Sequence, residues 1–556
     1  ISGKDFYMNF KKTISAVMAI TLAISGMTLF PATAENTDLF GDMNGDNAID
    51  ASDATLVLKY SAMQGAGSYN GTLEQFAIEN GFVVTHTNST ELFGDINNDK
   101  IVDASDATLI LQYSALYGSG QVVGTLKQFL ESLENENNIS DNTNSSIKDD
   151  GDMLTIVSWN DNDLKNMIEV FQEDYPDVNI RYLNCGASSG NGANASYQTF
   201  LNSDEDIDLF IAESGWILNY INDDSYSAPL SELDITQEDY TNAYAYTVDI
   251  GTDSNGVLKG ASWQAAPGGY CYNADLAKEY LGIETPEEMQ EKISDWDKFA
   301  VTGAELAEAS NGYITIAASL DDMWQCFSTS TNSPWLIDGK INTQTAREFT
   351  EMIIPYIQNE SIDSTVSQWG QYDWMVLGKD EETLGYFFST WCLTKGNQLE
   401  QCCGTEGNWR IVKGPQEYFW GGSWLCLSPK CDNKTDASNF VKYFTLNADS
   451  MEKYALKSGD FVNNQTVMEK IVTEGSNSNE LLGGQDQFAV LKDVAANIKL
   501  NETITQYDED LKLSLRYALH AESIFEAVWE NDIDAVINQF LEEAKSSVPE
   551  DLFPDE

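Results

Sequence analysis

The spacing of apolar residues beyond residue 152 alternates between strand and helix periodicity. Apolar runs at 154–159 and 207–211 and an apolar–polar alternation at 178–182 predict strands. Apolar residues recur at helical spacing at 164–171 and again at 533–541, where they form an amphipathic stripe. Strand, helix and strand in succession predict parallel sheets that are covered by helices on both faces.

The N-terminal part of the chain repeats itself at an offset of 53 residues. TDLFGD aligns with TELFGD, ATLVLKYSA with ATLILQYSA, and GTLEQF with GTLKQF, so that one copy covers 37–81 and the other 90–134. In each copy an acidic loop runs into apolar residues at helical spacing, which are Leu56, Tyr60 and Met63, and then Leu109, Tyr113 and Leu116. The pattern predicts a pair of loop-helix repeats.

Each acidic loop has twelve residues, with oxygen-bearing side chains at positions 1, 3, 5, 9 and 12. Side chains at alternate positions of a tight loop converge on one point, where calcium requires six to eight oxygen ligands. The backbone carbonyl at position 7 completes each shell. We therefore predict two calcium ions, whose ligands are Asp42, Asn44, Asp46, Ala48, Asp50 and Asp53 in the first copy and Asp95, Asn97, Asp99, Ile101, Asp103 and Asp106 in the second.

The twin motif GD-x-N-x-D-x-x-x-D-AS-DATL resembles the type I dockerins, whose paired loop-helix repeats carry Asp at position 12. The chain departs from that family at position 6, where Asn47 and Lys100 replace the usual Gly, and in its extra GTL-x-QF segments. The resemblance implies a small all-α calcium-binding module at 37–134 that binds a cohesin module of a scaffold protein. The alternative is a calcium-stabilised spacer without a partner.

The resemblance also implies which residues contact cohesin. In the dockerins these are loop positions 10 and 11 and the helix behind them. The corresponding residues are Ala51, Ser52, Leu58 and Lys59 in the first copy and Ala104, Ser105, Leu111 and Gln112 in the second. Since the copies match at three of these four places, either one is expected to make the contact.

Three further segments flank or connect the folded parts of the chain. Residues 1–34 contain Lys11, Lys12, an apolar run at 14–30 and a small-residue stretch PATA, which together predict an N-terminal extension and a signal peptide whose start is Met8. An uncleaved membrane anchor is the alternative. A polar, Asn/Ser/Asp-rich stretch at 135–152 predicts a flexible linker, and 547–556 a tail. We expect a secreted protein, extracellular or held at the cell surface by a scaffold, with no membrane insertion after signal removal.

The net charge of the chain limits the classes of molecule that it is expected to bind. The chain has 89 acidic and 30 basic residues, a formal charge of −59, which repels phosphate backbones and anionic lipids and argues against nucleic acid as a partner. Eight cysteines are too dilute for their spacing to define disulfides, so their pairing stays open. Cys271, Cys392 and Cys426 lie among apolar residues and are predicted to be buried thiols.

The distribution of tryptophan favours a sugar ligand. All 13 tryptophans lie between Trp159 and Trp529, beyond the repeats and the linker. Indole rings stack on the apolar faces of pyranoses, while acids and amides bind the hydroxyl groups. An aromatic cleft with an acidic rim therefore suits neutral sugars. Core packing is the alternative for each individual ring.

The order of segments over 153–546 resembles the family 1 extracellular solute-binding proteins of sugar ABC transporters. It is carried by FQEDYPDVNIRYL, DIDLFIAESGWILNYINDDSYSAPLSELD, GASWQAAPGGYCYNADLAKEYLG and WRIVKGPQEYFWGGSWLCLSPKCDNKTDASNFVKYF. The resemblance implies a two-lobed α/β periplasmic-binding-protein fold with a hinge near Trp263 that closes on a sugar. The implied contacts are Trp159, Asn160, Asp161, Glu213 and Trp216, together with Trp263, Tyr270, Trp391, Trp420 and Trp424 as stacking candidates.

The sequence thus predicts a multidomain, non-catalytic, oligosaccharide-binding protein. Its dockerin would attach it to a cohesin-bearing scaffold of a polysaccharide-degrading complex, and an ABC permease would be a further partner. No nucleophile elbow, HExxH motif or P-loop occurs in the chain. A dockerin-bearing glycoside hydrolase and a polymer-adhesion protein remain as alternatives.

Overall fold

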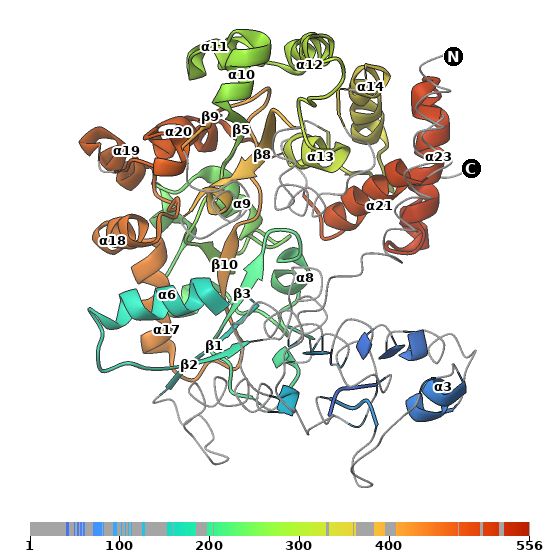
Figure 1. Ribbon diagram of the computed structural model, residues 1–556. Coiled ribbons are helices and arrows are strands. Elements are labelled where there is room, and N and C mark those ends of the chain that lie inside the picture. The colour runs from blue at the N-terminus through green and yellow to red at the C-terminus, as the bar shows by residue number, and fades with distance from the viewer. Residues whose placement is uncertain are drawn as a thin grey trace. The chain divides into compact units, whose positions relative to one another are not determined.

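The computed structural model divides the chain into two compact units, Ile1–Asn144 and Ser145–Glu556 (Figure 1). In the N-terminal unit it describes residues 40–43, 49, 53–54, 56–57, 59–61, 71–79, 82, 93–96, 100, 102, 106, 109–110, 113 and 125–127. In the C-terminal unit it describes residues 153–159, 161–184, 197–198, 200–203, 205–329, 333–359, 361–362, 383–394, 407–475, 477–500, 504–521 and 527–554.

A five-stranded sheet forms the first lobe of the C-terminal unit. Its strand order is β2 (Asn179–Asn184), β1 (Met153–Ser158), β3 (Leu209–Glu213), β10 (Ser423–Leu427) and β4 (Gly260–Ser262). β1 pairs in parallel with β2 and β3, as the sequence predicts. β10 is antiparallel to both β3 and β4, so the sheet is mixed. The expectation of a purely parallel sheet is therefore wrong at β10, which returns to this sheet from the second lobe.

A three-stranded antiparallel sheet forms the second lobe, in the order β8 (Gly385–Ser389), β5 (Gly268–Asn273) and β9 (Trp409–Val412). Successive side chains of a strand point to opposite faces. Tyr270 on β5 accordingly enters one apolar core, and its neighbour Cys271 enters the other. Cys271, Cys392 and Cys426 are buried free thiols, as predicted from their surroundings.

Two groups of helices cover these sheets (Figure 1). One group packs in the core of the first lobe: α6 (Asp161–Gln172), α8 (Leu218–Ile221), α9 (Ala245–Ile250), α17 (Lys434–Thr445), α18 (Ala448–Ser458), α19 (Gln465–Glu474) and α20 (Gln487–Asn497). The other packs in the core of the second lobe: α10 (Ala274–Leu281), α11 (Pro286–Lys292), α12 (Trp296–Ser310), α13 (Leu320–Ser328), α14 (Gln344–Gln358), α21 (Asp508–His520) and α23 (Ile533–Ala544). The helical stripes predicted at 164–171 and 533–541 are α6 and α23.

Short elements also occur in the described parts of the C-terminal unit. They are the hairpin β6 (Leu336–Ile337) and β7 (Lys340–Ile341), and the 3-10 helices η1 (Leu230–Leu233), η2 (Gln237–Tyr240), η4 (Thr390–Leu393), η5 (Glu480–Leu482) and η6 (Glu550–Leu552).

Local sequence explains where several helices begin and end. Asn273 accepts hydrogen bonds from two backbone amides at the start of α10, and Gly282 ends that helix with a positive φ of 69°. Thr285 and Glu288 form a reciprocal capping box at the start of α11. Such caps satisfy amide and carbonyl groups that have no partner inside the helix.

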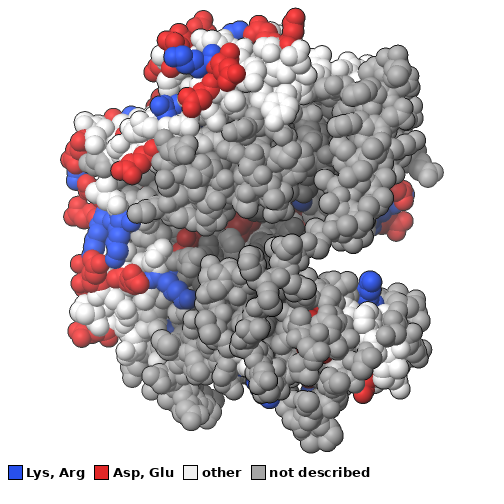
Figure 2. Space-filling view, viewed as in Figure 1, with Lys and Arg blue, Asp and Glu red and all other residues white. Residues whose placement is uncertain are grey.

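Salt bridges link helices on the outer surface of the first lobe. Lys470 on α19 lies 2.6 Å from Glu452 on α18, and Lys453 on α18 lies 2.8 Å from Asp174 after α6. Figure 2 shows acidic and basic side chains side by side along this edge. Each exposed pair contributes at most about 1 kcal/mol to stability, so the pairs mainly balance charge locally.

The N-terminal unit has its own small apolar core. Leu56 and Tyr60 of the first copy, Ile110 and Tyr113 of the second, and the helix α3 (Leu73–Glu79) all contribute to it. Each described residue of this unit is helical, in a turn or irregular. Met63 and Leu116 of the predicted helical stripes lie outside the described residues.

Candidate functional site

The two lobes are joined by chain segments that run side by side. Between β4 and β5 the chain crosses at 263–267, and between β9 and β10 it returns at 413–422. The backbone amide of Trp420 donates to the carbonyl of Ala266 (3.0 Å), and that of Gly268 donates to the carbonyl of Tyr418 (2.9 Å). These crossing segments lie beside Trp263, where the sequence predicts a hinge.

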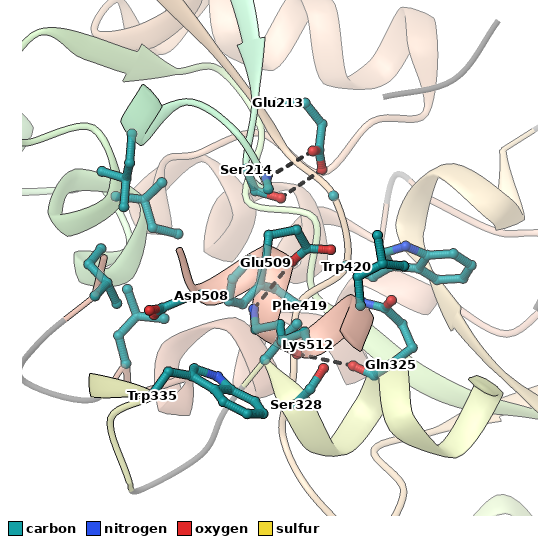
Figure 3. Close-up of a pocket in the computed structure, with 18 of the residues that line it drawn as sticks. Glu213, Ser214, Gln325, Ser328, Trp335, Phe419, Trp420, Asp508, Glu509 and Lys512 are labelled. Atoms are coloured by element: carbon teal, nitrogen blue, oxygen red, sulfur yellow. Dashed lines mark hydrogen bonds and ion pairs between the residues drawn. The ribbon is translucent and has the colours of Figure 1, made fainter. Parts of the chain in front are cut away.

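A cleft of about 150 Å³ lies beside these crossing segments (Figure 3). The first lobe contributes the end of β3 to its wall, the second lobe contributes α13, α21 and Trp335, and the crossing segment contributes 419–421. The lining residues include Glu213, Ser214, Gly215, Leu218, Ile250, Trp324, Gln325, Ser328, Thr329, Trp335, Phe419, Trp420, Gly421, Leu500, Ile504, Thr505, Gln506, Asp508, Glu509, Lys512, Leu513 and Arg516.

Glu213, the last residue of β3, presents its carboxyl group to the cleft (Figure 3). The Ser214 hydroxyl donates to one carboxyl oxygen (2.7 Å), and the Gly215 amide donates to the other (2.8 Å). Burial raises the pKa of Glu213 to about 7; these two hydrogen bonds oppose the shift, and the charge of Glu509 adds to it. The ionised carboxylate only accepts hydrogen bonds, whereas the protonated form can also donate one.

The first turns of α21 place charged groups along the cleft. The Lys512 ammonium lies 3.6 Å from the Glu509 carboxylate, so these two charges balance locally. The Thr505 hydroxyl donates to Asp508 (2.5 Å), whose pKa is raised by burial. Farther along α21, the Arg516 guanidinium lies 4.0 Å from the buried Asp321 carboxylate. Acidic and basic groups thus share this wall.

Aromatic side chains form another part of the lining. Trp420 contacts Trp391 edge-on, with ring centroids 4.8 Å apart, and the Trp391 indole N–H donates to the Trp420 carbonyl (3.0 Å). Both indoles are only partly buried. Trp391 thus orients Trp420, which lines the cleft next to Phe419.

Trp335 has a different environment. Its ring is 1% exposed, it packs against Trp324 at right angles, and its indole nitrogen has no hydrogen-bond partner. A buried N–H without a partner costs free energy, and Trp335 is also one of the residues that line the cleft. Sequence reasoning missed Trp335, Asp508 and Glu509, because no local motif brings 335 and 508–509 together.

Several predicted sugar-contact residues lie in the core instead. Trp263, Tyr270 and Trp424 are at most 1% exposed, and the Trp424 indole donates to the Thr247 carbonyl (2.8 Å). Trp216 is 4% exposed and packs against aromatic neighbours. These residues have no free ring face for stacking, which corrects the expectation drawn from the resemblance.

The remaining candidates have a mixed outcome. Trp159 is partly buried against the first-lobe core, Asn160 lies outside the described residues, and the side chain of Asp161 is likewise not described. Glu213 and Trp420 line the cleft, and Trp391 supports Trp420.

The N-terminal loops are described mainly at their first and last ligand positions. Asp42, Asp53, Asp95 and Asp106 are buried, and Asp53 and Asp106 accept equivalent hydrogen bonds from the amides of Met43 (2.7 Å) and Ile96 (2.6 Å). One Asp95 carboxyl oxygen is buried without a partner. Such a carboxylate oxygen fits a hard cation such as calcium. Among the described residues no group of three or more potential ligands converges.

One departure from the dockerin pattern is the lysine at position 6 of the second loop, and its backbone conformation shows how the loop accommodates it. Lys100 adopts a positive φ of 73°, the conformation that usually selects Gly, and its amide donates to Asp95 (3.0 Å). The loop therefore makes its sharp turn with lysine, at a cost in backbone strain.

The other predicted ligands and nearly all predicted cohesin contacts lie outside the described residues. The ligands are Asn44, Asp46, Ala48, Asp50, Asn97, Asp99, Ile101 and Asp103. The contacts are Ala51, Ser52, Leu58, Ala104, Ser105, Leu111 and Gln112. Lys59 is described, and its side chain is exposed.

Comparison with known proteins identifies the family. The family described as bacterial extracellular solute-binding protein matches residues 166–477, more than half of the chain. The chain belongs to this family. Its members bind solutes and do not transform them, so the expectation that the protein is not an enzyme is confirmed. The extracellular character of the family supports an exported protein.

Solved structures show the same fold at low sequence identity. A family 1 extracellular solute-binding protein is 17% identical with a TM-score of 0.61, covering 71% of this chain and 99% of that one. A transporter-associated binding protein of B. animalis subsp. lactis in complex with β-1,6-galactobiose is 15% identical (TM-score 0.55; 71% and 98% covered). The sugar-binding protein MalE of Xanthomonas citri is also 15% identical (TM-score 0.55; 71% and 96% covered).

No curated protein matches this solute-binding protein in sequence. Within the described parts of the chain, no helix combines the length and apolar character needed to cross a bilayer. The predicted signal segment lies outside the described residues.

Proposed function

We propose that the C-terminal unit binds a neutral oligosaccharide in the cleft and presents it to an ABC permease. The observation that carries this proposal is the combination of indole and carboxyl groups on one cleft between two hinged lobes. The similar structures with galactobiose and of a sugar-binding MalE support a sugar as the ligand class.

The cleft matches the two chemistries of a sugar. Trp420 and Phe419 offer apolar surface for pyranose C–H faces, and Glu213 and Asp508 offer acceptors for hydroxyl groups. The Glu213 carboxyl is held by Ser214 and Gly215, and an ionised carboxylate can accept further hydrogen bonds. Lys512 and Arg516 limit the negative charge of the wall.

Calorimetric titration with malto-, cello- and xylo-oligosaccharides tests this proposal. We expect one series to bind and Trp420→Ala to weaken it. Absence of binding to every series, with the fold intact, would contradict it. A reducing-sugar assay on starch, xylan and cellulose checks the hydrolase alternative, and we expect no turnover.

We further propose that the N-terminal unit is a calcium-loaded dockerin that attaches the protein to a cohesin-bearing scaffold. Two buried, equivalent loop ends and the unpartnered Asp95 oxygen support the calcium sites. Bound calcium would neutralise the clustered carboxylates, and the duplicated motif would present nearly the same surface twice.

Cohesin binding by paired loop variants tests the attachment. Ala51→Asp with Ser52→Asp disables one predicted face, and Ala104→Asp with Ser105→Asp disables the other. We expect either pair alone to leave substantial affinity, and all four changes to abolish it. Loss of binding from one pair alone would show a single binding mode, and full binding in chelator would exclude calcium dependence.

A further inference from the structure

The glycine before each loop has no room for a side chain. Gly41 and Gly94 precede the first ligands Asp42 and Asp95 and have positive φ angles of 106° and 92°. A Cβ atom added to Gly41 would lie 2.4 Å from Leu126, and one added to Gly94 would lie 2.3 Å from Leu73. A leucine side chain therefore packs directly against the glycine at each loop entrance.

These contacts cross between the two copies. Leu73 begins the helix α3 in the GTLEQF segment of the first copy, yet it covers the entrance of the second loop. Leu126, its counterpart in GTLKQF, covers the first loop. Both leucines are at most 1% exposed. The added segments distinguish this chain from the usual dockerin pattern. Each of them packs against the loop of the other copy.

Other residues lie beside these contacts. An added Cβ on Gly94 would also lie 3.1 Å from Val102, and one on Gly41 would lie 3.3 Å from Ile49, the residues at position 8 of the two loops. Lys127, which follows Leu126, lies over the Phe40 ring at 5.4 Å from its centroid. Each leucine therefore packs where the entrance of the opposite loop lies close to position 8 of that loop.

We propose that Leu73 and Leu126 are positioning residues for calcium in the opposite copy: Leu73 for the second loop and Leu126 for the first. This inference rests on the proposed calcium sites. Each leucine holds the loop entrance against position 8, and thereby keeps the first carboxylate in place before the ion binds. Replacing a buried leucine by alanine leaves a cavity into which the loop entrance can relax. Calcium binding must then restore the ordered conformation of the loop, which lowers the affinity.

The proposal is tested in two variants of the full chain, each of which keeps only one functional calcium loop. Asp42→Ala silences the first loop and Asp95→Ala the second, and calcium binding to the remaining loop is measured by calorimetry. With the first loop silenced, we expect Leu73→Ala to weaken calcium binding about tenfold and Leu126→Ala to have a much smaller effect. With the second loop silenced, the order of the two effects should reverse.

Control variants separate positioning from global stability. Ile78→Ala changes a 57% exposed residue of the same helix and should leave calcium affinity unchanged in both backgrounds. Where a leucine-to-alanine variant fails to fold, leucine-to-valine should show the same order of effects. Equal effects on both loops, or an effect only on the loop of the same copy, would overturn the proposal. Failure of the unmutated chain to bind calcium would instead overturn the calcium sites themselves.

Discussion

The two units of this protein differ in how their chemistry is encoded. In the N-terminal unit, the predicted ligands of each calcium lie within twelve consecutive residues, and the loop appears twice. In the C-terminal unit, the cleft joins Glu213, Trp335, Trp420 and Glu509, which are far apart in sequence. Local spacing can reveal a site of the first kind, whereas a site of the second kind exists only after the lobes have folded.

Removal of calcium should cause the largest difference in stability between the two units. The N-terminal unit has a small core and buried carboxylates, so we expect a chelator to unfold it. The C-terminal unit has two large apolar cores and should be unaffected. Differential scanning calorimetry of the full chain should lose one transition and keep the other. An unchanged thermogram in chelator would contradict this difference.

Two tryptophans that lie close together in the sequence, Trp420 and Trp424, should behave in opposite ways. Trp424→Ala empties a fully buried site and should cost about 3–5 kcal/mol of unfolding free energy. Trp420→Ala removes a partly exposed cleft residue and should instead weaken oligosaccharide binding about tenfold or more. Denaturant unfolding and calorimetric titration of both variants measure the two effects. Similar profiles would remove the distinction between core and cleft.

The indole N–H of Trp335 offers a finer test of the cleft. Trp335→Phe keeps most of the ring and removes the donor, so we expect about a fivefold loss of ligand affinity with little loss of stability. Trp216→Phe is a matched control, because its buried indole N–H also lacks a partner but does not line the cleft. Equal affinities for the two variants would show that Trp335 does not bind the ligand.

The smallest expected effect concerns pH. Burial, together with the charge of Asp163, raises the pKa of Asp460 to about 7, from its ordinary value of 3.8. Between these values the folded state keeps a proton that the unfolded state has lost, so stability falls as pH rises. Asp460→Asn should flatten this part of the melting-temperature profile between pH 4 and 7. Equal profiles for Asp460→Asn and the unmutated chain would contradict the assignment.

Much of the fold could be predicted because periodicity is a local property. The strands β1, β2 and β3 and the helices α6 and α23 lie where the apolar spacing indicates. The antiparallel direction of β10 was not predicted, since strand direction depends on which lobe the chain returns from. Three of the stacking candidates, Trp263, Tyr270 and Trp424, lie in the core for a related reason. An aromatic residue near the crossing segments has the same local sequence signal whether it faces the core or the cleft.

The sequence by itself determined the repeat, the acidic loops and the order of segments that places the chain among solute-binding proteins, because each depends on residues close together or in fixed order. Only the tertiary structure decided that Trp424 is core and Trp420 lines the cleft, that Trp335 joins α21 at one wall, and that Leu73 and Leu126 cover each other's loops. These outcomes depend on how separate segments pack, and packing follows from the shape of the whole unit rather than from any local pattern.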